Sequence, residues 1–189
     1  RHADGTGVNE QGNGHDIFGD IIQDEREAAD LMHHVFNGKS VDELDDLAHI
    51  RFGPMYGGQG FAGSPNQAAS NQDYRWGCPV HLVSGCGAQQ ATFFPTVAID
   101  ANSGTVDITG DHGQGVLIVR NGEIHIRGNF KFAGIIIAEG TLRIWGTPQI
   151  EGAVIAIGDQ AVIDPGDETT TTGNSLIRFN KCEIVSAQR

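Results

Sequence analysis

Seven glycines at intervals of six residues constrain this chain more than any other feature of its sequence. They occupy positions 122, 128, 134, 140, 146, 152 and 158. The residues between them alternate in hydropathy, as in "EIHIR", "NFKFA" and "TLRIW", where the second and fourth positions are apolar. A period of two indicates a strand with one buried face. Because such short strands leave no room for hairpin turns, we expect each glycine to turn the chain through a corner.

Three sides of this length make a coil of about 18–19 residues, which predicts a mainly β fold, a short parallel β-solenoid (β-helix). Glycines 104, 122, 140 and 158 would stack at one corner, 110, 128 and 146 at the second, and 134 and 152 at the third. Coils would begin near Val97, Val116, Ile135 and Ala153, and a fifth, partial coil would begin at Leu176. Each inward Ile, Leu, Val or Phe would contribute about 1.5–3 kcal/mol through its burial.

One side of the coil is apolar at both sets of positions, in "VLIVR", "IIIAE" and "AVIAI". The inward set would be Leu117, Val119, Ile136, Ala138, Val154 and Ala156. The outward set would be Val116, Ile118, Ile135, Ile137, Ala153, Ile155 and Ile157. A strand that is apolar on both faces is buried on both faces, so something must cover the outward set. The prediction is an N-terminal helical segment packed on this face; another subunit is the alternative.

The pattern divides the chain into residues 1–95 and 96–189. The first part begins with a polar arm, continues with helical spacing in "DIIQDEREAADLMHHVFNG", and ends in a long Gly-rich loop. Between the first helical segment and this loop lies "SVDELDDLAHIRFG". It is predicted to be a second helix, at the start of which Ser40 and Glu43 form a capping box. The second part is the solenoid, and its segment at 164–174, "DPGDETTTTGN", is interpreted as a loop inserted at a corner.

The net charge limits the classes of partner that fit this sequence, and the cysteines indicate the compartment. The formal net charge of −12 argues against nucleic acid and anionic membranes as partners. The sequence has no run of 18 apolar residues, so membrane attachment is expected only through an anchor absent from this chain. Cys78 and Cys86 in "CPVHLVSGC" are spaced for a small loop disulfide, with free buried thiols as the alternative. A disulfide would fit an extracellular or cell-envelope (periplasm or cell-surface) location.

Two segments together resemble a known family. "GVLIVRNGEIHIRGNFKFAGIIIAEGTLRIWGTPQIEGAVI" and "GNSLIRFNKCEIVSAQ" are similar to the C-terminal β-solenoid region of PilX-type pilus assembly proteins. The resemblance covers about residues 97–189, and Cys182 stands where the family has a cysteine near its end. It implies a cell-envelope protein of the type IV pilus machinery. The family's N-terminal membrane helix is absent from this sequence, as expected of a fragment or a processed chain.

Catalytic and metal-binding interpretations find little support in the residues. His125 is the only histidine in the regular repeat, and it shares an outward column with Asp107 and Arg143, which is typical of a charged ladder rather than an acyltransferase site. Asp107 and Glu123 are not stacked in phase, as a polysaccharide-cleaving groove would require. Two further groups could bind a metal, Asp30 with His33 and His34, and Asp164 with Asp167 and Glu168. Adjacent histidines point different ways on a helix, and the second group is typical of a solvated acidic loop, so neither is predicted to be a metal site.

The sequence therefore predicts no catalytic residue, no cofactor and no metal site, and a protein that is not an enzyme. The predicted function is that of a structural or adhesive component of a cell-surface appendage or of its assembly system. Its partners would be copies of itself or pilin-like proteins. The alternative is a carbohydrate-binding or carbohydrate-active β-helix protein, in which Tyr56, Tyr74, Trp76 and Trp145 would have to converge. Ice binding is disfavoured because the threonines of the repeat do not line up on one face.

Overall fold

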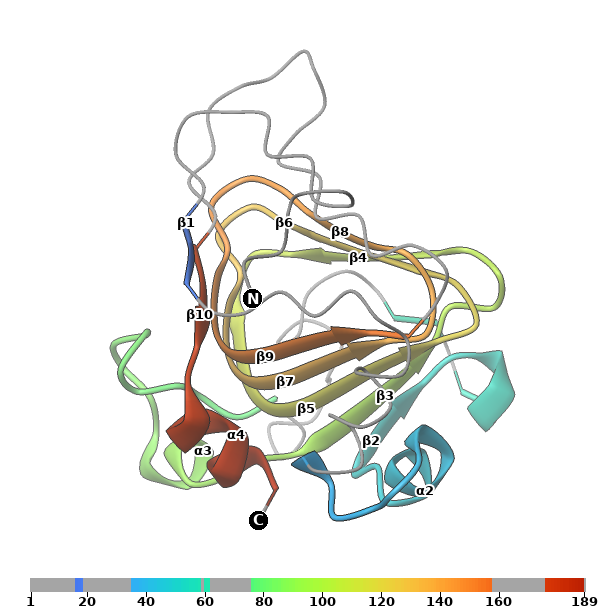
Figure 1. The fold of residues 1–189 in the computed structure, drawn as a ribbon, viewed down its shortest axis with the longest axis horizontal. Coiled ribbons are helices and arrows are strands. Elements are labelled where there is room, and N and C mark those ends of the chain that lie inside the picture. The colour runs from blue at the N-terminus through green and yellow to red at the C-terminus, as the bar shows by residue number, and fades with distance from the viewer. Residues whose placement is uncertain (1–15, 19–34, 59, 62–75, 158–175, 189) are drawn as a thin grey trace, which may run out of the picture.

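The computed structural model of the chain describes residues 16–18, 35–58, 60–61, 76–157 and 176–188. Within these residues the chain is mainly β, and its strands wind into a parallel β-solenoid of about three turns. Figure 1 looks along the stack, where the coils lie over one another and enclose a common interior. The predicted β-solenoid is confirmed.

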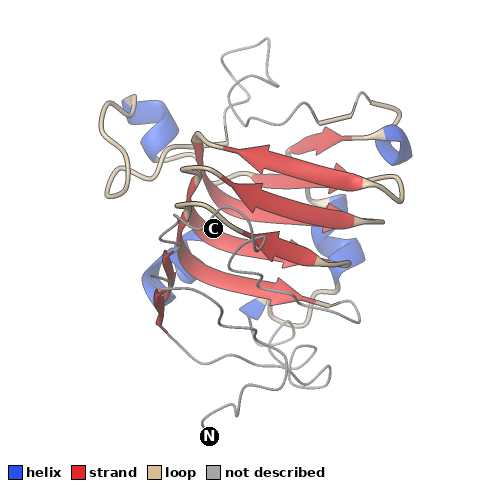
Figure 2. Ribbon diagram, turned by 90° about the horizontal axis from the view of Figure 1, so that it is seen from above, coloured by secondary structure: helices blue, strands red, loops and turns tan. Residues whose placement is uncertain are grey.

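The described strands form two sheets in which every pairing is parallel (Figure 2). The seven-stranded sheet has the order β1-β10-β9-β7-β5-β3-β2, and the three-stranded sheet has the order β4-β6-β8. The first comprises β1 (Asp16–Phe18), β2 (Ile50–Phe52), β3 (Thr96–Asp100), β5 (His112–Arg120), β7 (Lys131–Ala138), β9 (Gln149–Ala156) and β10 (Leu176–Phe179). The second comprises β4 (Thr105–Thr109), β6 (Glu123–Arg127) and β8 (Leu142–Ile144). The described helical elements are α2 (Val41–Asp46), η1 (Pro54–Tyr56), α3 (Ala88–Ala91) and α4 (Lys181–Ala187).

Glycines stack at all three corners of the coil, as the six-residue spacing predicts. The stacked sets are Gly104, Gly122 and Gly140; Gly110, Gly128 and Gly146; and Gly115, Gly134 and Gly152. Gly158, the last member of the first predicted set, lies outside the described residues. The third set gains Gly115, which precedes the regular spacing.

The third corner differs from the other two because the strands pass through it without interruption. Gly134 and Gly152 lie inside β7 and β9, with φ angles of 139° and 140°. A Cβ atom on Gly134 would collide with the carbonyl oxygen of Gly115 on the coil beside it. Only glycine allows both this φ and this close approach. Two sides of the coil therefore belong to one bent sheet, which spacing alone does not reveal.

The predicted alternation fills the interior of the coil. On β7, Phe132, Ile136 and Ala138 all belong to the inner apolar cluster and are fully or almost fully buried. The same cluster contains Val106, Ile108, Leu117, Val119, Ile124, Ile126, Phe130, Leu142, Ile144 and Ile150. In register, Ile124 pairs with Val106 on one side and Leu142 on the other, so apolar side chains form continuous columns. These columns supply most of the burial that stabilises the solenoid.

Aromatic side chains from the Gly-rich segment close one end of the interior. Phe61 lies with its ring centroid 5.4 Å from that of Phe52 and 5.3 Å from that of Trp76. Trp76 is fully buried, and a Cβ atom on Gly113 would lie only 3.1 Å from the Trp76 Cβ, so glycine leaves the room that the indole occupies. Phe61 and Trp76, which the sequence places in the Gly-rich loop, therefore contribute to the apolar interior.

The second predicted helix is shorter than its apolar spacing suggests. Ser40 and Glu43 do form the predicted capping box, but α2 ends at Asp46 and Leu47 is 55% exposed. Ile50, predicted to lie on the helix, begins β2, which pairs with β3 at the edge of the seven-stranded sheet. Pairing with the open edge of β3 satisfies the backbone groups of β2 and also places Ile50 in the inner apolar cluster. The first predicted helix lies almost entirely outside the described residues.

Two details of the predicted coil register need correction. Val116 pairs with Ile135 and Ile135 with Ala153, as predicted, but Val116 pairs with Thr96 rather than Val97. The first coil therefore begins one residue earlier than the repeat suggests. The fifth coil does start at Leu176 as β10, but it consists of this strand alone. Asn180 then caps α4, since its side-chain oxygen accepts a hydrogen bond from the backbone N–H of Cys182 at 3.0 Å.

Candidate functional site

The residues predicted to face outward on the apolar side form a second buried cluster. We refer to Val116, Ile118, Ile135, Ile137, Ala153 and Ile155 as the outer apolar face. They are packed against Ile184 and Ala187 of α4 and against Phe36 and Leu44. Ile157, the last residue of the predicted set, follows the end of β9 and is 39% exposed. The outer apolar face is thus covered by segments of the same chain.

Helix α4 makes extensive contact with the outer apolar face, lying across β5, β7 and β9 (Figure 1). Its start is anchored where Asn180 Nδ2 donates a hydrogen bond to Glu151 Oε2 at 3.2 Å. Just beyond its end, Gln188 Nε2 donates to the backbone carbonyl of Val35. Sequence reasoning assigned this segment to the solenoid and missed the helix. The signals that it carries are an asparagine at the N-cap and apolar residues three apart, Ile184 and Ala187.

An ion cluster centred on the largely buried Arg120 joins α2 to the end of β5. Arg120 at the end of β5 donates to Asp42 Oδ1 at 2.6 Å and to Asp45 Oδ2 at 3.1 Å. Its Nε also donates to Glu139 Oε2 at 3.1 Å, and its side chain is only 15% exposed. The hydrogen bond to Glu139, together with the bonds to both aspartates, raises the pKa of Arg120, so that this cation is permanent.

Asp45 in turn binds the aromatic residue that follows β2. The hydroxyl of Tyr56 donates to Asp45 Oδ1 at 2.7 Å. Burial and this hydrogen bond raise the pKa of Tyr56, which keeps the phenol in its donating form. Asp45 therefore has a partner on each carboxylate oxygen, as a buried carboxylate requires.

The predicted charged column lies on the outer side of the three-stranded sheet. Asp107, His125 and Arg143 are paired in register across β4, β6 and β8. His125 Nε2 lies 3.2 Å from Glu123 Oε2, and its ring centroid lies 4.9 Å from that of Trp145, edge to face. Arg127 pairs with Asp107 at 3.3 Å. This arrangement is a ladder of surface side chains in which Asp107 has Arg127, and His125 has Glu123 and Trp145, as a neighbour.

The aromatic residues that a carbohydrate site would need do not converge among the described residues. Trp76 is fully buried in the interior, so it offers no surface. Tyr56 is bound to Asp45, whereas Trp145 packs against His125 on the three-stranded sheet. Tyr74 lies outside the described residues. The described members of the set therefore form no common exposed platform of the kind on which sugars stack.

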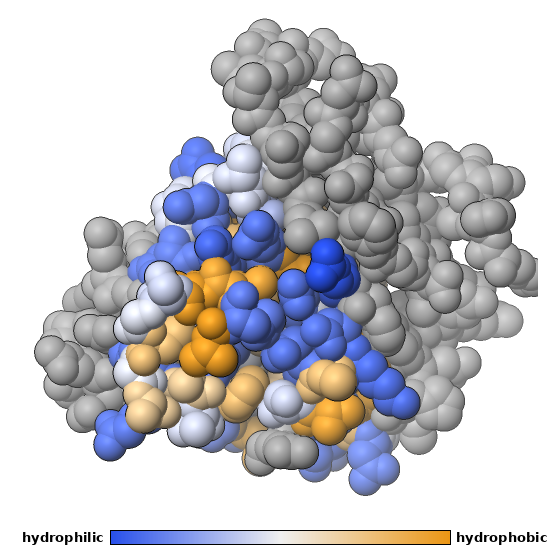
Figure 3. Space-filling view, turned by 90° about the vertical axis from the view of Figure 1, so that its left-hand side faces the viewer, coloured by the Kyte–Doolittle hydropathy of each residue, from blue (hydrophilic) through white to orange (hydrophobic). Residues whose placement is uncertain are grey.

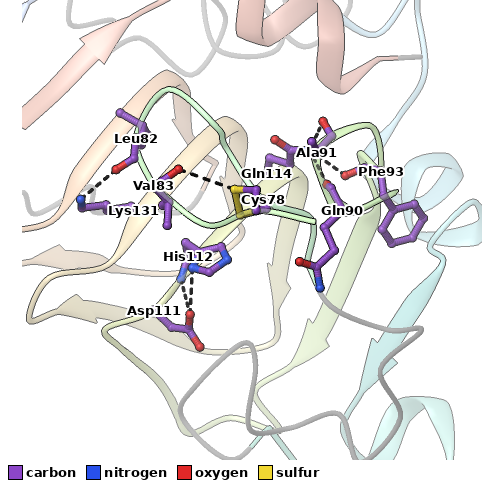
Figure 4. The surroundings of a disulfide bond; sticks show 11 residues. Cys78, Leu82, Val83, Gln90, Ala91, Phe93, Asp111, His112, Gln114 and Lys131 are labelled. Atoms are coloured by element: carbon purple, nitrogen blue, oxygen red, sulfur yellow. Dashed lines mark hydrogen bonds and ion pairs between the residues drawn. A yellow bond between two sulfur atoms is a disulfide. The ribbon is translucent and has the colours of Figure 1, made fainter. Parts of the chain in front are cut away.

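The structure joins Cys78 and Cys86 in a disulfide (Figure 4). We refer to residues 78–86 as the disulfide loop. Lys131 Nζ donates to the carbonyl of Leu82 at 2.8 Å, and Cys78 N donates to the carbonyl of Gln90 at 3.0 Å. The loop is thereby attached to β7 of the solenoid and to α3. Cys182 on α4 is a free, exposed cysteine.

Beside the disulfide loop, the buried side-chain amide of Gln114 holds the segment around α3 in place. Gln114 on β5 donates through Nε2 to the backbone carbonyls of Gln90, Ala91 and Phe93, at 2.9–3.1 Å (Figure 4). Its side chain is almost completely buried. Side-chain bonds to backbone carbonyls hold a segment that has little regular structure of its own. The disulfide loop and α3 are thus fixed as one unit on the side of the coil.

Within the part of the chain that the structure describes, no three His, Cys, Asp or Glu side chains are grouped closely enough to hold a metal ion. The two places considered from the sequence, around His33 and around Asp164, lie outside it. No helix among the described residues is long and apolar enough to cross a bilayer.

Three surfaces or clusters therefore stand out: the outer apolar face with its cover, the charged ladder, and the disulfide loop beside α4. The outer apolar face is already covered by other segments of the chain, whereas the disulfide loop is held on the outside of the coil.

Comparison of the chain with protein-family models, with curated proteins and with solved structures finds no match.

Proposed function

We propose that this protein is a structural or adhesive component of a cell-surface appendage or of its assembly system, similar to a type IV pilus, and acts through protein–protein contacts. The observation that carries the proposal is the construction of the coil. A stack of parallel strands with an apolar interior supports a disulfide-closed loop held on its side by Lys131 and Gln114. Such a stack is a rigid support for side chains that contact another protein.

The proposal includes the compartment and the partners. The Cys78–Cys86 disulfide supports an extracellular or cell-envelope location, because oxidising compartments preserve such bonds. The partners are copies of this chain or pilin-like proteins. The resemblance of residues 97–189 to PilX-type pilus assembly proteins favours the same role.

We also propose that the N-terminal helical segment lies along the outer apolar face. Phe36 and Leu44 belong to the outer cluster, and Val35 and Val41 pack against it. These contacts support the proposal because Val35 and Phe36 lie at the end of the first predicted helix, whereas Val41 and Leu44 belong to α2. Arg120 would then hold α2 in place through Asp42 and Asp45.

The assembly state at native concentration tests the proposed function. We expect negative-stain microscopy and light scattering to show ordered self-assembly, or stable complexes after addition of a purified pilin-like protein. Binding would persist in the presence of oligosaccharides, because the contacts are between proteins. A chain that remains monomeric, ignores pilin-like proteins and binds glycans would contradict the proposal and favour a carbohydrate-binding role instead.

A further inference from the structure

Exposed asparagines that precede a glycine are places where this chain can react with itself and with water. Figure 3, which faces the side where α3 and α4 lie in Figure 1, shows hydrophilic side chains around an apolar area, and water reaches such polar groups. Asparagine is thermally labile, and a following glycine has no side chain to shield its backbone nitrogen. The sequence has three such pairs, Asn13–Gly14, Asn37–Gly38 and Asn121–Gly122, of which the first lies outside the described residues.

The two described pairs have the same local chemistry and a similar backbone. Asn37 has a φ angle of 53° and Asn121 a φ angle of 55°, so both are left-handed. Both asparagines are exposed to solvent, and each precedes a glycine in a connection between regular elements. Neither the dipeptide nor the backbone therefore distinguishes them.

The side chains of the two asparagines differ in what holds them. Asn121 Nδ2 donates a hydrogen bond to Asp100 Oδ1 at 3.0 Å, and the Asp100 carboxylate is buried and ionised. Turning the Asn121 amide toward the nitrogen of Gly122 breaks this charge-assisted bond. Within the ranges that the structure describes, no hydrogen bond holds the side chain of Asn37. The Asn37 amide is therefore free to turn toward the backbone.

We propose that Asn37 is a site of spontaneous deamidation and that Asp100 protects the matching pair at Asn121. The backbone nitrogen of Gly38 attacks the side-chain carbonyl carbon of Asn37 and forms a C–N bond. The bond from this carbon to the amide nitrogen breaks, and the amide leaves with the backbone proton as ammonia. Water then opens the cyclic imide to aspartate or isoaspartate. One water is consumed and one ammonia released, with no change of oxidation state. The modification needs no partner and does not depend on the proposed function.

The consequences of the reaction differ between the two positions. At Asn121 the product would place a carboxylate where an amide now donates to Asp100, and two like charges would face each other at a corner of the coil. At Asn37 the new carboxylate lies in an exposed turn, shortly before Ser40 caps α2. A negative charge near the start of a helix is tolerated. The pair left unprotected is thus the one whose product the fold accommodates.

The test follows both asparagines in the complete 189-residue chain during incubation in mildly alkaline buffer. Trypsin cleaves after Lys39 and Arg120, so the two residues fall in different peptides, each with one asparagine, and mass spectrometry measures the conversion of each. In the folded chain, Asn37 should convert about tenfold or more faster than Asn121, because a hydrogen bond to a charged group must first break. Equal rates, or faster conversion at Asn121, overturn the proposal.

The same measurement in concentrated urea separates structure from sequence. Without the fold, the two Asn–Gly pairs should convert at similar rates, since the contact with Asp100 is lost. A ratio in urea as large as that in the folded chain would mean that neighbouring residues in the sequence decide the rates, and it would overturn the protective role of the fold.

A pair of variants tests Asp100 itself. Asp100→Asn should accelerate conversion at Asn121 severalfold and leave the rate at Asn37 unchanged, with circular dichroism showing that the variant is folded. Ile136→Ala is the matched control, because it destabilises the solenoid from the interior and leaves Asp100 in place. It should leave Asn121 protected. If Ile136→Ala accelerates Asn121 as much as Asp100→Asn does, the protection comes from overall stability and the role assigned to Asp100 is wrong.

Discussion

The two sheets of the solenoid share the same interior but differ on their outer sides. On the seven-stranded sheet, Ile118, Ile135 and Ile137 point outward and are completely buried beneath other segments of the chain. On the three-stranded sheet, His125 and Arg143 occupy the outward positions and remain partly exposed. A strand with two apolar faces needs a cover, whereas a strand with one polar face is complete when it is exposed to water. The comparison shows that the polarity of the outward side chains decides which side of the coil the rest of the chain covers.

The largest expected difference concerns the corner glycines. Gly134→Ala should destabilise the protein by more than about 4 kcal/mol, because the added Cβ collides with the Gly115 carbonyl inside a continuous strand. Gly128→Ala, at a corner beside the three-stranded sheet, should cost only about 1–2 kcal/mol, since its Cβ meets its nearest atom at 3.5 Å and only its positive φ is strained. Urea unfolding of both variants measures the difference. If the two variants lose equal stability, the corner at Gly134 is no less tolerant of a side chain than the corner at Gly128.

The second prediction compares two arginines that differ in burial. Arg120→Met should cost about 3–5 kcal/mol, because it leaves the buried carboxylate of Asp45 beside Glu139 without its cation. Arg127→Met removes the exposed ion pair with Asp107 and should cost less than about 1 kcal/mol. Thermal or urea unfolding distinguishes the two. A small effect of Arg120→Met would show that α2 is not held through this cluster.

The third prediction tests the outer sides directly. Ile137→Ala should destabilise by about 2–5 kcal/mol, as much as Ile136→Ala on the inner side of the same strand, because both side chains are completely buried. His125→Ala, outward on the three-stranded sheet, should change stability by less than about 1 kcal/mol. Should Ile137→Ala prove as mild as His125→Ala, the cover over the outer apolar face contributes no stability.

The fourth prediction concerns acid sensitivity at the end of β3, where the chain leaves the seven-stranded sheet. Burial alone would raise the pKa of Asp100, but hydrogen bonds from Asn121 Nδ2 and the backbone N–H groups of Met55 and Asn102 outweigh it and hold the pKa below its ordinary value. The bonds therefore stabilise the fold fully above the unfolded pKa of about 3.9, and this stability is lost as the pH falls through the lower, folded pKa.

The measurement is the free energy of unfolding between pH 6 and about pH 3, in the range where aspartate titrates. The wild-type value should fall on acidification, and Asp100→Asn should be less stable at pH 6 but lose less of its remaining stability. Asp107→Asn on the three-stranded sheet, where the carboxylate is more exposed, is the matched control for the removal of one carboxylate. An unchanged slope in Asp100→Asn would contradict the assignment.

Much of the solenoid was predictable because its signals are local. Six-residue glycine spacing and the alternation between glycines depend only on neighbours in the chain, and they correctly predicted the coil, its stacked corners and the inward columns. The doubly apolar segments also predicted that the outer apolar face would be covered. The capping box of Ser40 and Glu43 was readable for the same reason, since its two bonds join residues three apart.

The candidate surfaces were less predictable because they depend on contacts between distant residues. Arg120 and Asp45 are 75 positions apart, and the carbonyl that accepts a hydrogen bond from Lys131 lies 49 positions away. No local pattern marks such partners. Likewise, Ile50–Phe52 carries enough helical spacing to extend α2, and only the open edge of β3 selects the strand.

The sequence by itself determined the repeating part of this protein: where the corners lie, which side chains face inward, and which side of the coil needs a cover. These properties follow from backbone sterics and from the period of a strand, both of which act within a few residues. Only the tertiary structure decided what covers that side, that α4 is a helix, and that the disulfide loop stands beside it. Those outcomes depend on which distant segment buries the most apolar area while satisfying its own polar groups.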